Sequence, residues 1–326
     1  MSVGASAWSP QSLRHAFAWM RGRRYVNAPM ARYTSLRVGG PADLLLIPAD
    51  VDEVRAVVAC ATAQGVPLSW LGNGSNLIVR AGGIRGLVVS LHDALSHVSA
   101  RAPFQEQEMH PGDLVHVRVG AGVPLTRVLH RVIRDGLRGL SFAVGIPGTL
   151  GGAVVMNAGT EVGAIWDVVE CVRLLLSTGE MVDVRPEEVV VGYRVAALPE
   201  HSVVLGATLR AERANPLEVR EEVRQLYRRR RERQPLSYPN AGSIFKNPPG
   251  ERAGHLIDQL GLKGYRIGDA QVSVKHANFI VNCGKASVVD VLTLIDYVKC
   301  HVLVHTGILL EEEVRIVGES KGDPAG

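Results

Sequence analysis

The sequence of 326 residues has little of what marks several common classes of protein. Aromatic residues make up only 5% of it, whereas glycine occurs 35 times. This composition predicts tight turns and close backbone contacts rather than a helical bundle. No run of 18 apolar residues occurs, so we expect no membrane-spanning helix and no membrane partner. The arginines near the N-terminus have no apolar signal segment beside them, which predicts a cytoplasmic protein.

Motifs for metal ligation and for disulfides are missing as well. The 11 histidines include no H-E-x-x-H motif, and the four cysteines show no C-x-x-C spacing. We therefore expect no metal site, and we expect Cys60, Cys171, Cys283 and Cys300 to be reduced core residues. A formal net charge of +4 is too small to indicate a nucleic-acid partner.

The one concentrated run of charge is RRRRER at residues 228–233, which follows the acidic stretch EVREEV. Acidic residues first and basic residues last suit the dipole of a solvated helix. The same arginines would also suit an anion, so both interpretations stay open at this point.

The length and the order of elements favour a mixed α/β or α+β protein of two domains. A turn at Gly39, Gly40 and Pro41 leads into an apolar strand that Pro48 ends, residues 50–65 have helical spacing, and VPLSWLG follows as a short strand. A hairpin is expected at Thr178-Gly179, VVVGYR is expected to be a strand, and a charged helix begins near residue 215. The last hundred residues read as a separate unit of helices and strands.

Two glycine-rich loops stand out within the first domain. GNGSNL at residues 72–77 offers a backbone free enough to present successive N–H groups to a diphosphate, although a plain tight turn fits equally. It lacks the third glycine of the dinucleotide fingerprint and the lysine of a P-loop. The second stretch, GLSFAVGIPGTLGGAVVMNAG at residues 139–159, adds a Pro-Gly turn against which a flat or phosphorylated ligand could lie.

A serine on a rigid turn is the third notable feature. Ser243 lies in YPNAGSIFKNPPG, next to Gly242 and with no histidine close by to make it a nucleophile.

The motifs LGNGSN, GIPGTLGGAVVMNAG, GYR, AGSIFKNP, KHANFIVN and LEEEVR occur in this order. Together they resemble the UDP-N-acetylenolpyruvoylglucosamine reductase (MurB) family, over nearly the whole chain from about Asn27 to Gly318.

The resemblance implies an α+β fold with a two-lobed FAD-binding domain of the PCMH/vanillyl-alcohol-oxidase type at 27–214. A smaller α+β substrate-binding domain would follow at 215–318, with an extension at 1–26 and a polar tail at 319–326. The family reduces an enolpyruvyl ether on UDP-N-acetylglucosamine to a lactyl ether. NADPH reduces noncovalent FAD, departs and is replaced by the UDP-sugar.

The resemblance also assigns roles to residues. Catalysis would fall to Arg194, Ser243 and Glu313. Substrate binding would involve Tyr193, Lys246 and Asn247, with Arg230 on the UDP diphosphate. The residues expected to bind FAD come from both glycine loops: Gly72, Asn73, Gly74, Ser75, Asn76, Gly145, Ile146, Pro147, Gly148, Gly151, Gly152 and Asn157.

This chemistry calls for a proton donor rather than a nucleophile at Ser243. After hydride addition to the vinyl group, C2 is a strongly basic enolate carbon that a positioned hydroxyl can protonate. Arg194 would bind the substrate carboxylate, and Glu313 would act in its protonated form. The plainer alternatives are a turn serine and a strand-end ion pair between Glu313 and Arg315.

Ala196 stands where the family often has serine, which puts one local hydrogen bond in doubt. The short spacing between Arg194 and Ser243 resembles the subclass without an inserted tyrosine loop. Two other functions stay open: a flavin oxidase of the same fold, and a noncatalytic UDP-sugar sensor. We expect a monomer.

Overall fold

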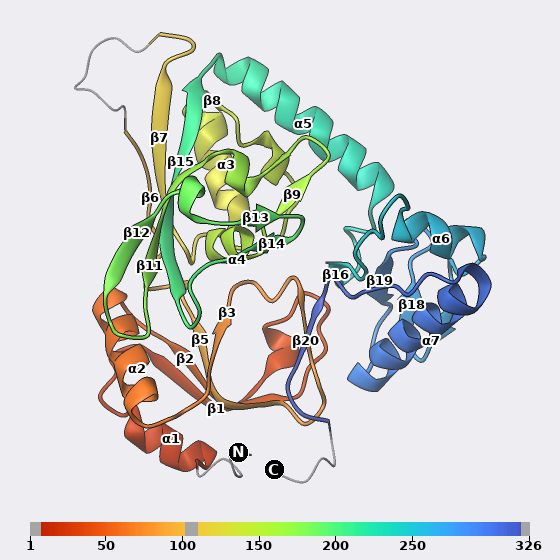
Figure 1. Ribbon diagram of the computed structural model, residues 1–326, viewed down its shortest axis with the longest axis horizontal. Helices are drawn as coiled ribbons and strands as arrows, with labels where there is room; N and C mark the ends of the chain where they lie inside the picture. Colours follow the sequence, from red (N-terminus) through yellow and green to blue (C-terminus); the bar gives the residue numbers. More distant parts are fainter. Residues whose placement is uncertain (1–7, 102–109, 321–326) are drawn as a thin grey trace.

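The computed structural model describes residues 8–101 and 110–320 (Figure 1). The first lobe is a four-stranded sheet in the order β1-β2-β5-β3, with helix α2 (Val51–Ala63) crossing over it. Its strands are β1 (Arg23–Pro29), β2 (Pro41–Ile47), β3 (Leu68–Leu71) and β5 (Ile84–Ser90). The strand-helix-strand pattern expected from residue 41 onward is therefore confirmed. Asp50 caps the start of α2 by accepting a hydrogen bond from the Glu53 amide.

The second lobe is a larger antiparallel sheet in the order β12-β11-β15-β7-β6, in which β8 also pairs with β15. Its long central strand is β15 (Val203–Arg213), and the predicted hairpin joins β11 (Val169–Leu175) to β12 (Met181–Val184). The other elements of this lobe are β6 (Val98–Arg101), β7 (Leu114–Gly120), α3 (Leu125–Arg134), β8 (Leu137–Arg138), α4 (Leu150–Val155), β9 (Gly159–Thr160) and β10 (Gly163–Ala164).

One predicted strand of this lobe is wrong. VVVGYR forms only β13 (Val191–Gly192), which turns straight into β14 (Val195–Ala196). Val189 and Val191 pack against the core while Val190 is 78% exposed, but Arg194 has φ +60°, and this left-handed turn ends the strand after Gly192. The turn of this small hairpin carries Tyr193 and Arg194.

Helix α5 (Pro216–Arg233) packs Val223 and Leu226 against the main core and leads from the second lobe to the C-terminal unit in Figure 1. A four-stranded sheet in the order β16-β19-β18-β17 packs with α6 (Ala253–Gln259) and α7 (Val288–Thr306). The strands of this sheet are β16 (Asn240–Ser243), β17 (Arg266–Ile267), β18 (Ala270–Val272) and β19 (Phe279–Asn282).

The last strand returns to the first lobe. β20 (Arg315–Val317) pairs in parallel with β4 (Leu77–Val79), which directly follows the first glycine loop. Figure 1 shows β20 in blue beside the orange strands of that lobe. Because β4 belongs to the first lobe and β20 follows the C-terminal unit in sequence, this pairing ties the two parts of the molecule together.

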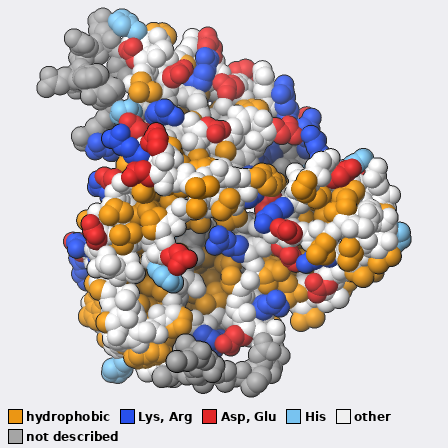
Figure 2. All heavy atoms as spheres, in the orientation of Figure 1, with side chains coloured by type: hydrophobic (Ala, Val, Ile, Leu, Met, Phe, Trp, Pro, Cys, Tyr) orange, Lys and Arg blue, Asp and Glu red, His pale blue; other side chains and the backbone are white. Residues whose placement is uncertain are grey.

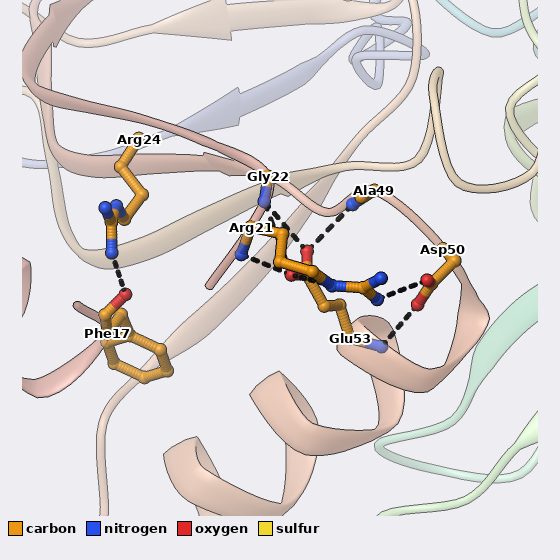
Figure 3. Close-up of polar contacts among 7 residues, drawn as sticks. All are labelled: Phe17, Arg21, Gly22, Arg24, Ala49, Asp50 and Glu53. Atoms are coloured by element: carbon orange, nitrogen blue, oxygen red, sulfur yellow. Dashed lines mark hydrogen bonds and ion pairs between the residues drawn. The ribbon is translucent and has the colours of Figure 1, made fainter. Parts of the chain in front are cut away.

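The N-terminal helix α1 (Pro10–Ala16) belongs to the main core, a role that the sequence did not predict. Leu13 and Phe17 are fully buried in the hydrophobic cluster that both lobes share. Figure 3 shows how the segment after α1 is held by the buried carboxylate of Glu53. This carboxylate accepts hydrogen bonds from the amides of Arg21, Gly22 and Ala49.

The cysteine prediction is wrong in part. All four cysteines are free thiols, but Cys60, Cys171 and Cys283 are only half-buried and Cys300 on α7 is exposed. Along the described chain, no helix has both the length and the apolar character needed to cross a membrane.

Candidate functional site

A cavity of about 1100 Å³ lies where the second lobe, the first glycine loop and the C-terminal unit meet. Figure 2 shows acidic and basic side chains gathered around this junction, between the lobes and the C-terminal unit. Most of the predicted site residues line the cavity: Gly72, Asn73, Gly74, Ser75, Asn76, Ile146, Pro147, Gly148, Gly151, Gly152, Asn157, Tyr193, Arg194, Arg230, Ser243, Asn247 and Glu313.

The first glycine loop joins β3 to β4 and needs its glycines for close backbone contact. Gly74 has φ +58°, and a Cβ there would lie 2.1 Å from the carbonyl oxygen of Tyr33. A Cβ on Gly72 would lie 2.7 Å from the Thr149 hydroxyl oxygen. The two glycines therefore let the loop pack closely against Tyr33 and Thr149, and the loop itself lines the cavity, where a diphosphate could lie against it.

The second glycine loop leads into α4 and packs against α5. Gly145 does not line the cavity itself, but it has φ +68° and leaves room for the side chain of Arg230, whose Cδ would lie 2.7 Å from a Cβ. Arg230 donates from Nη1 to the Val144 carbonyl at 3.0 Å and from Nε to Gln234 at 2.8 Å. The missing side chain at Gly145 thus gives the arginine its path to the cavity.

Arg230 differs from its neighbours in the basic run. Arg228, Arg229, Arg231 and Arg233 are exposed, as a solvated helix predicts, although Arg229 and Arg233 also reach the cavity wall. Burial, together with the nearby charge of Arg194, lowers the pKa of Arg230 to about 10. The guanidinium is therefore still charged at neutral pH.

Arg194, at the turn of the small hairpin, is held in place by three contacts. Arg194 donates from Nε to Glu313 Oε1 at 2.6 Å and from Nη1 to the Gly159 carbonyl at 3.2 Å. Its guanidinium lies 5.2 Å from the centre of the Tyr193 ring, a cation–π geometry. Asn157 adds a hydrogen bond of 2.9 Å to the Gly192 carbonyl, which fixes the hairpin against the end of the second glycine loop.

Glu313 is the partner of Arg194, so the alternative ion pair with Arg315 is not what the structure contains. Its side chain is only 11% exposed. Burial raises the pKa of Glu313, while Arg194 and then Lys246 act in the opposite direction without cancelling the rise. A raised pKa favours the protonated form expected for this residue.

Ser243 ends strand β16, where it pairs with Phe279. The preceding Gly242 has φ +77°, and its amide donates to the side chain of Asn240 at 3.0 Å, which fixes the turn. The Glu313 amide donates to the carbonyl of Ile244 at 2.8 Å. The backbone thus places Ser243 and Glu313 on neighbouring segments, and both side chains line the cavity.

Two predicted substrate residues are engaged elsewhere. The ammonium group of Lys246 pairs with Glu311 at 3.2 Å and does not line the cavity. Asn247 lines it, but its side-chain oxygen accepts a hydrogen bond from the Ala253 amide at 3.1 Å.

The sequence analysis missed Thr149 and Gln234, which also line the cavity. Thr149 caps α4 and accepts from the Gly152 amide, and a threonine just before an apolar helical run is a recognisable start signal. Gln234 holds Arg230 from the following turn, a contact that no local pattern announces.

A second cavity of about 400 Å³ lies beside the first glycine loop. It shares Leu71, Gly72 and Asn73 with the large cavity. Arg23, Tyr25, Arg32 and Tyr33 give it a basic and aromatic lining.

Both glycine loops line the large cavity within a two-lobed α+β domain, an arrangement that fits an FAD-binding protein. A family model described as the FAD binding domain matches residues 42–185. A second, described as the C-terminal domain of UDP-N-acetylenolpyruvoylglucosamine reductase, matches residues 234–317. The expected fold class, a two-lobed FAD-binding domain with a smaller C-terminal domain, is confirmed.

Whole-chain comparisons agree with these two matches. A UDP-N-acetylenolpyruvoylglucosamine reductase of Thiobacillus denitrificans is 43% identical over 92% of this chain and 94% of its own length. One of Geobacter metallireducens is 44% identical over 93% and 96%. The crystal structure of the Thermus caldophilus reductase (MurB) has a TM-score of 0.74 at 36% identity, covering 91% of this chain and 99% of that one.

The chain belongs to the UDP-N-acetylenolpyruvoylglucosamine reductase family. It is accordingly a flavin-dependent oxidoreductase with FAD as its cofactor.

Proposed function

We propose that this protein reduces UDP-N-acetylenolpyruvoylglucosamine to UDP-N-acetylmuramate in the synthesis of peptidoglycan precursors, with NADPH as electron donor. The observation that carries the proposal is the convergence of Arg194, Ser243 and Glu313 on the cavity lined by both glycine loops. These three residues come from the second lobe, the C-terminal sheet and the segment before β20. Since one chain supplies them all, a monomer suffices for activity, and we propose a cytoplasmic monomer.

The residues present fit FAD. Gly72 and Gly74 leave the first loop's backbone open where a Cβ would collide with its neighbours. The large and small cavities meet at this loop, so a molecule with its diphosphate on the loop extends into both. We assign the adenosine end to the small cavity and the flavin end to the large one. Bound FAD supplies hydride transfer from its N5 to the vinyl group of the substrate.

The side chains around the flavin end bind, orient and protonate the substrate. Arg194 presents a guanidinium that is already held by Glu313 and Gly159, and it binds the substrate carboxylate through its remaining N–H groups. The protonated Glu313 stabilises charge that develops on that carboxylate. Ser243 delivers a proton to C2, which is basic enough to take it from a hydroxyl.

Arg230 and Tyr193 complete the proposed substrate site. Arg230 is charged at neutral pH and half-buried in the cavity wall, where a diphosphate would find a preformed partner. Tyr193 is 55% exposed beside Arg194, within reach of a large UDP-sugar. Asn247 contributes from the rim, while Lys246 acts only through its charge, which lowers the pKa of Glu313.

The test combines a spectrum with an assay. The purified protein is expected to show a flavin absorbance band that is released on denaturation. NADPH should reduce this flavin once without the UDP-sugar and should be oxidised through repeated turnovers only when UDP-N-acetylenolpyruvoylglucosamine is present. Mass spectrometry should find a UDP-sugar product heavier by two hydrogens. A flavin oxidase would consume oxygen with another substrate, and a sensor would bind the UDP-sugar without turnover. Either result, or a protein unable to take up FAD, contradicts the proposal.

A further inference from the structure

A chain of three hydrogen bonds runs behind the first glycine loop and ends on the second. The Ser90 hydroxyl lies 2.7 Å from Nδ1 of His92, and Nε2 of His92 lies 2.7 Å from Oδ1 of Asn73. Asn73 then donates from Nδ2 to the Pro147 carbonyl at 2.7 Å. Ser90, at the end of β5, is only 4% exposed, so the chain is anchored in the core of the first lobe.

The direction of every hydrogen bond in this chain follows from its last member. A carbonyl can only accept, so the NH₂ group of Asn73 must face Pro147 and its oxygen must face His92. His92 must therefore carry its hydrogen on Nε2, and in the neutral ring Nδ1 accepts from the Ser90 hydroxyl. Burial lowers the pKa of His92, which favours this neutral form.

This series of hydrogen bonds fixes the contact between Asn73 and Pro147, which joins the two loops to which FAD binding is assigned. Within the part of the chain that the structure describes, the Asn73–Pro147 hydrogen bond is the one that joins residues 72–76 to residues 145–148. A diphosphate that bridges both loops needs their N–H groups at a fixed spacing before it arrives, because a loop ordered only on binding weakens the affinity.

We propose that His92 is a positioning residue for FAD. It holds the Asn73 amide in the one orientation that bonds Pro147, and so keeps both glycine loops at the spacing that the cofactor requires. This inference rests on the assignment of the two loops to FAD in the proposed function. His92 lines the small cavity next to Asn73, but the contact that matters is the one it makes through Asn73.

Two variants at His92 separate this role from general packing. In His92→Gln the side-chain amide nitrogen can occupy the place of Nε2 and still donate to Asn73. In His92→Asn the shorter amide reaches only as far as Nδ1, next to Ser90. FAD is added to flavin-free protein, and quenching of its fluorescence gives the Kd. We expect Kd to rise about fivefold in His92→Asn, the factor that corresponds to about 1 kcal/mol, and to stay within about twofold of the parent in His92→Gln.

Thermal melting of the flavin-free proteins tests whether each variant folds. A double-mutant cycle with Asn73→Ala tests whether His92 affects Kd through Asn73. Asn73→Ala should raise Kd, and adding His92→Asn to it should raise Kd no further. Equal Kd values for His92→Asn and the parent, equal effects of the two His92 variants, or additive effects in the cycle would overturn the role of His92. If Asn73→Ala itself leaves Kd unchanged, the Asn73–Pro147 hydrogen bond does not set the loop spacing and the inference fails, whereas a parent protein that takes up no FAD would contradict the proposed function.

Discussion

The carboxyl group of Glu313 is buried next to Arg194, and the two influences shift its pKa in opposite directions. Burial dominates and raises the pKa above its ordinary value, so the group keeps its proton to higher pH than an exposed glutamate. The proposed role needs this proton, because an ionised Glu313 would repel the substrate carboxylate. The pH range over which the enzyme works is therefore linked to one side chain.

We expect oxidation of the reduced flavin by the enolpyruvyl substrate to slow as pH rises through the raised pKa of Glu313. Glu313→Gln retains an N–H donor that does not titrate, so its rate should be flat across that pH range. Stopped-flow absorbance at a series of pH values checks this. A glutamine variant with the same pH dependence as the parent would assign the titration to another group.

Arg230 gives a second prediction at the residue scale, because it is the arginine of the run that turns inward. Arg230→Ala should raise KM for the UDP-sugar about tenfold or more, the loss of one charge-assisted hydrogen bond, while NADPH still reduces the flavin at nearly the parental rate. Arg228→Ala is the matched control, since Arg228 is exposed on the same helix. Unchanged KM in Arg230→Ala would make its contact with the Val144 carbonyl a purely structural one and would contradict a role in substrate binding.

At the scale of elements, the segment after α1 is fastened by Glu53 at the start of α2. Three backbone amides converge on this buried carboxylate (Figure 3). Desolvation raises the pKa of Glu53, but the amides and Arg21 together outweigh it and the net pKa is lowered. A lowered pKa in the folded state means that this contribution to stability is present above the unfolded pKa and is lost as pH falls through the folded one.

Glu53→Gln should therefore lower the free energy of unfolding at pH 7 by about 3 kcal/mol, because an amide cannot accept all of these hydrogen bonds. The difference from the parent should shrink once pH falls below the folded pKa of Glu53. Urea denaturation at pH 7 and at acidic pH measures both values. Asp52→Asn serves as the control, a nearby acidic residue in the same helix turn that is exposed. A constant difference between Glu53→Gln and the parent at both pH values would count against the linkage.

Local signals explain which elements the sequence predicts. The strand and helix of residues 41–63 have apolar periodicity and an Asp50 cap, so neighbouring residues determine them. The pairing of β4 with β20 joins segments at opposite ends of the chain, and the partner of Glu313 proved to be Arg194 rather than the nearby Arg315. The glycine loops could be recognised in the sequence because their glycines are close neighbours in it. The contact of His92 with Asn73 could not, because it depends on how β5 lies beside the loop.

On the scale of the whole molecule, β20 joins the first glycine loop and the segment that carries Glu313 into one structural unit. The Arg315 amide donates to the Asn76 carbonyl at 3.0 Å, and Asn76 donates from Nδ2 to the Glu313 carbonyl at 3.1 Å. Asn76, predicted as a cofactor residue, thus holds the backbone on both sides of Val314, directly after Glu313. We expect a chain ending before β20 to lose both cofactor affinity and the position of Glu313.

The central claim is that Ser243 protonates the substrate in a cavity built from all three parts of the chain. The most direct measurement is stopped-flow absorbance of the flavin in Ser243→Ala, with reduction by NADPH and oxidation by the enolpyruvyl substrate followed separately. Ser237→Ala, an exposed serine a few residues earlier, is the control and should match the parent in both halves.

The account predicts that Ser243→Ala retains FAD and is reduced by NADPH at nearly the parental rate. Its oxidation by the substrate should slow by roughly 10²–10⁴-fold, the contribution of a positioned acid. Oxidation at the parental rate in Ser243→Ala would contradict the account.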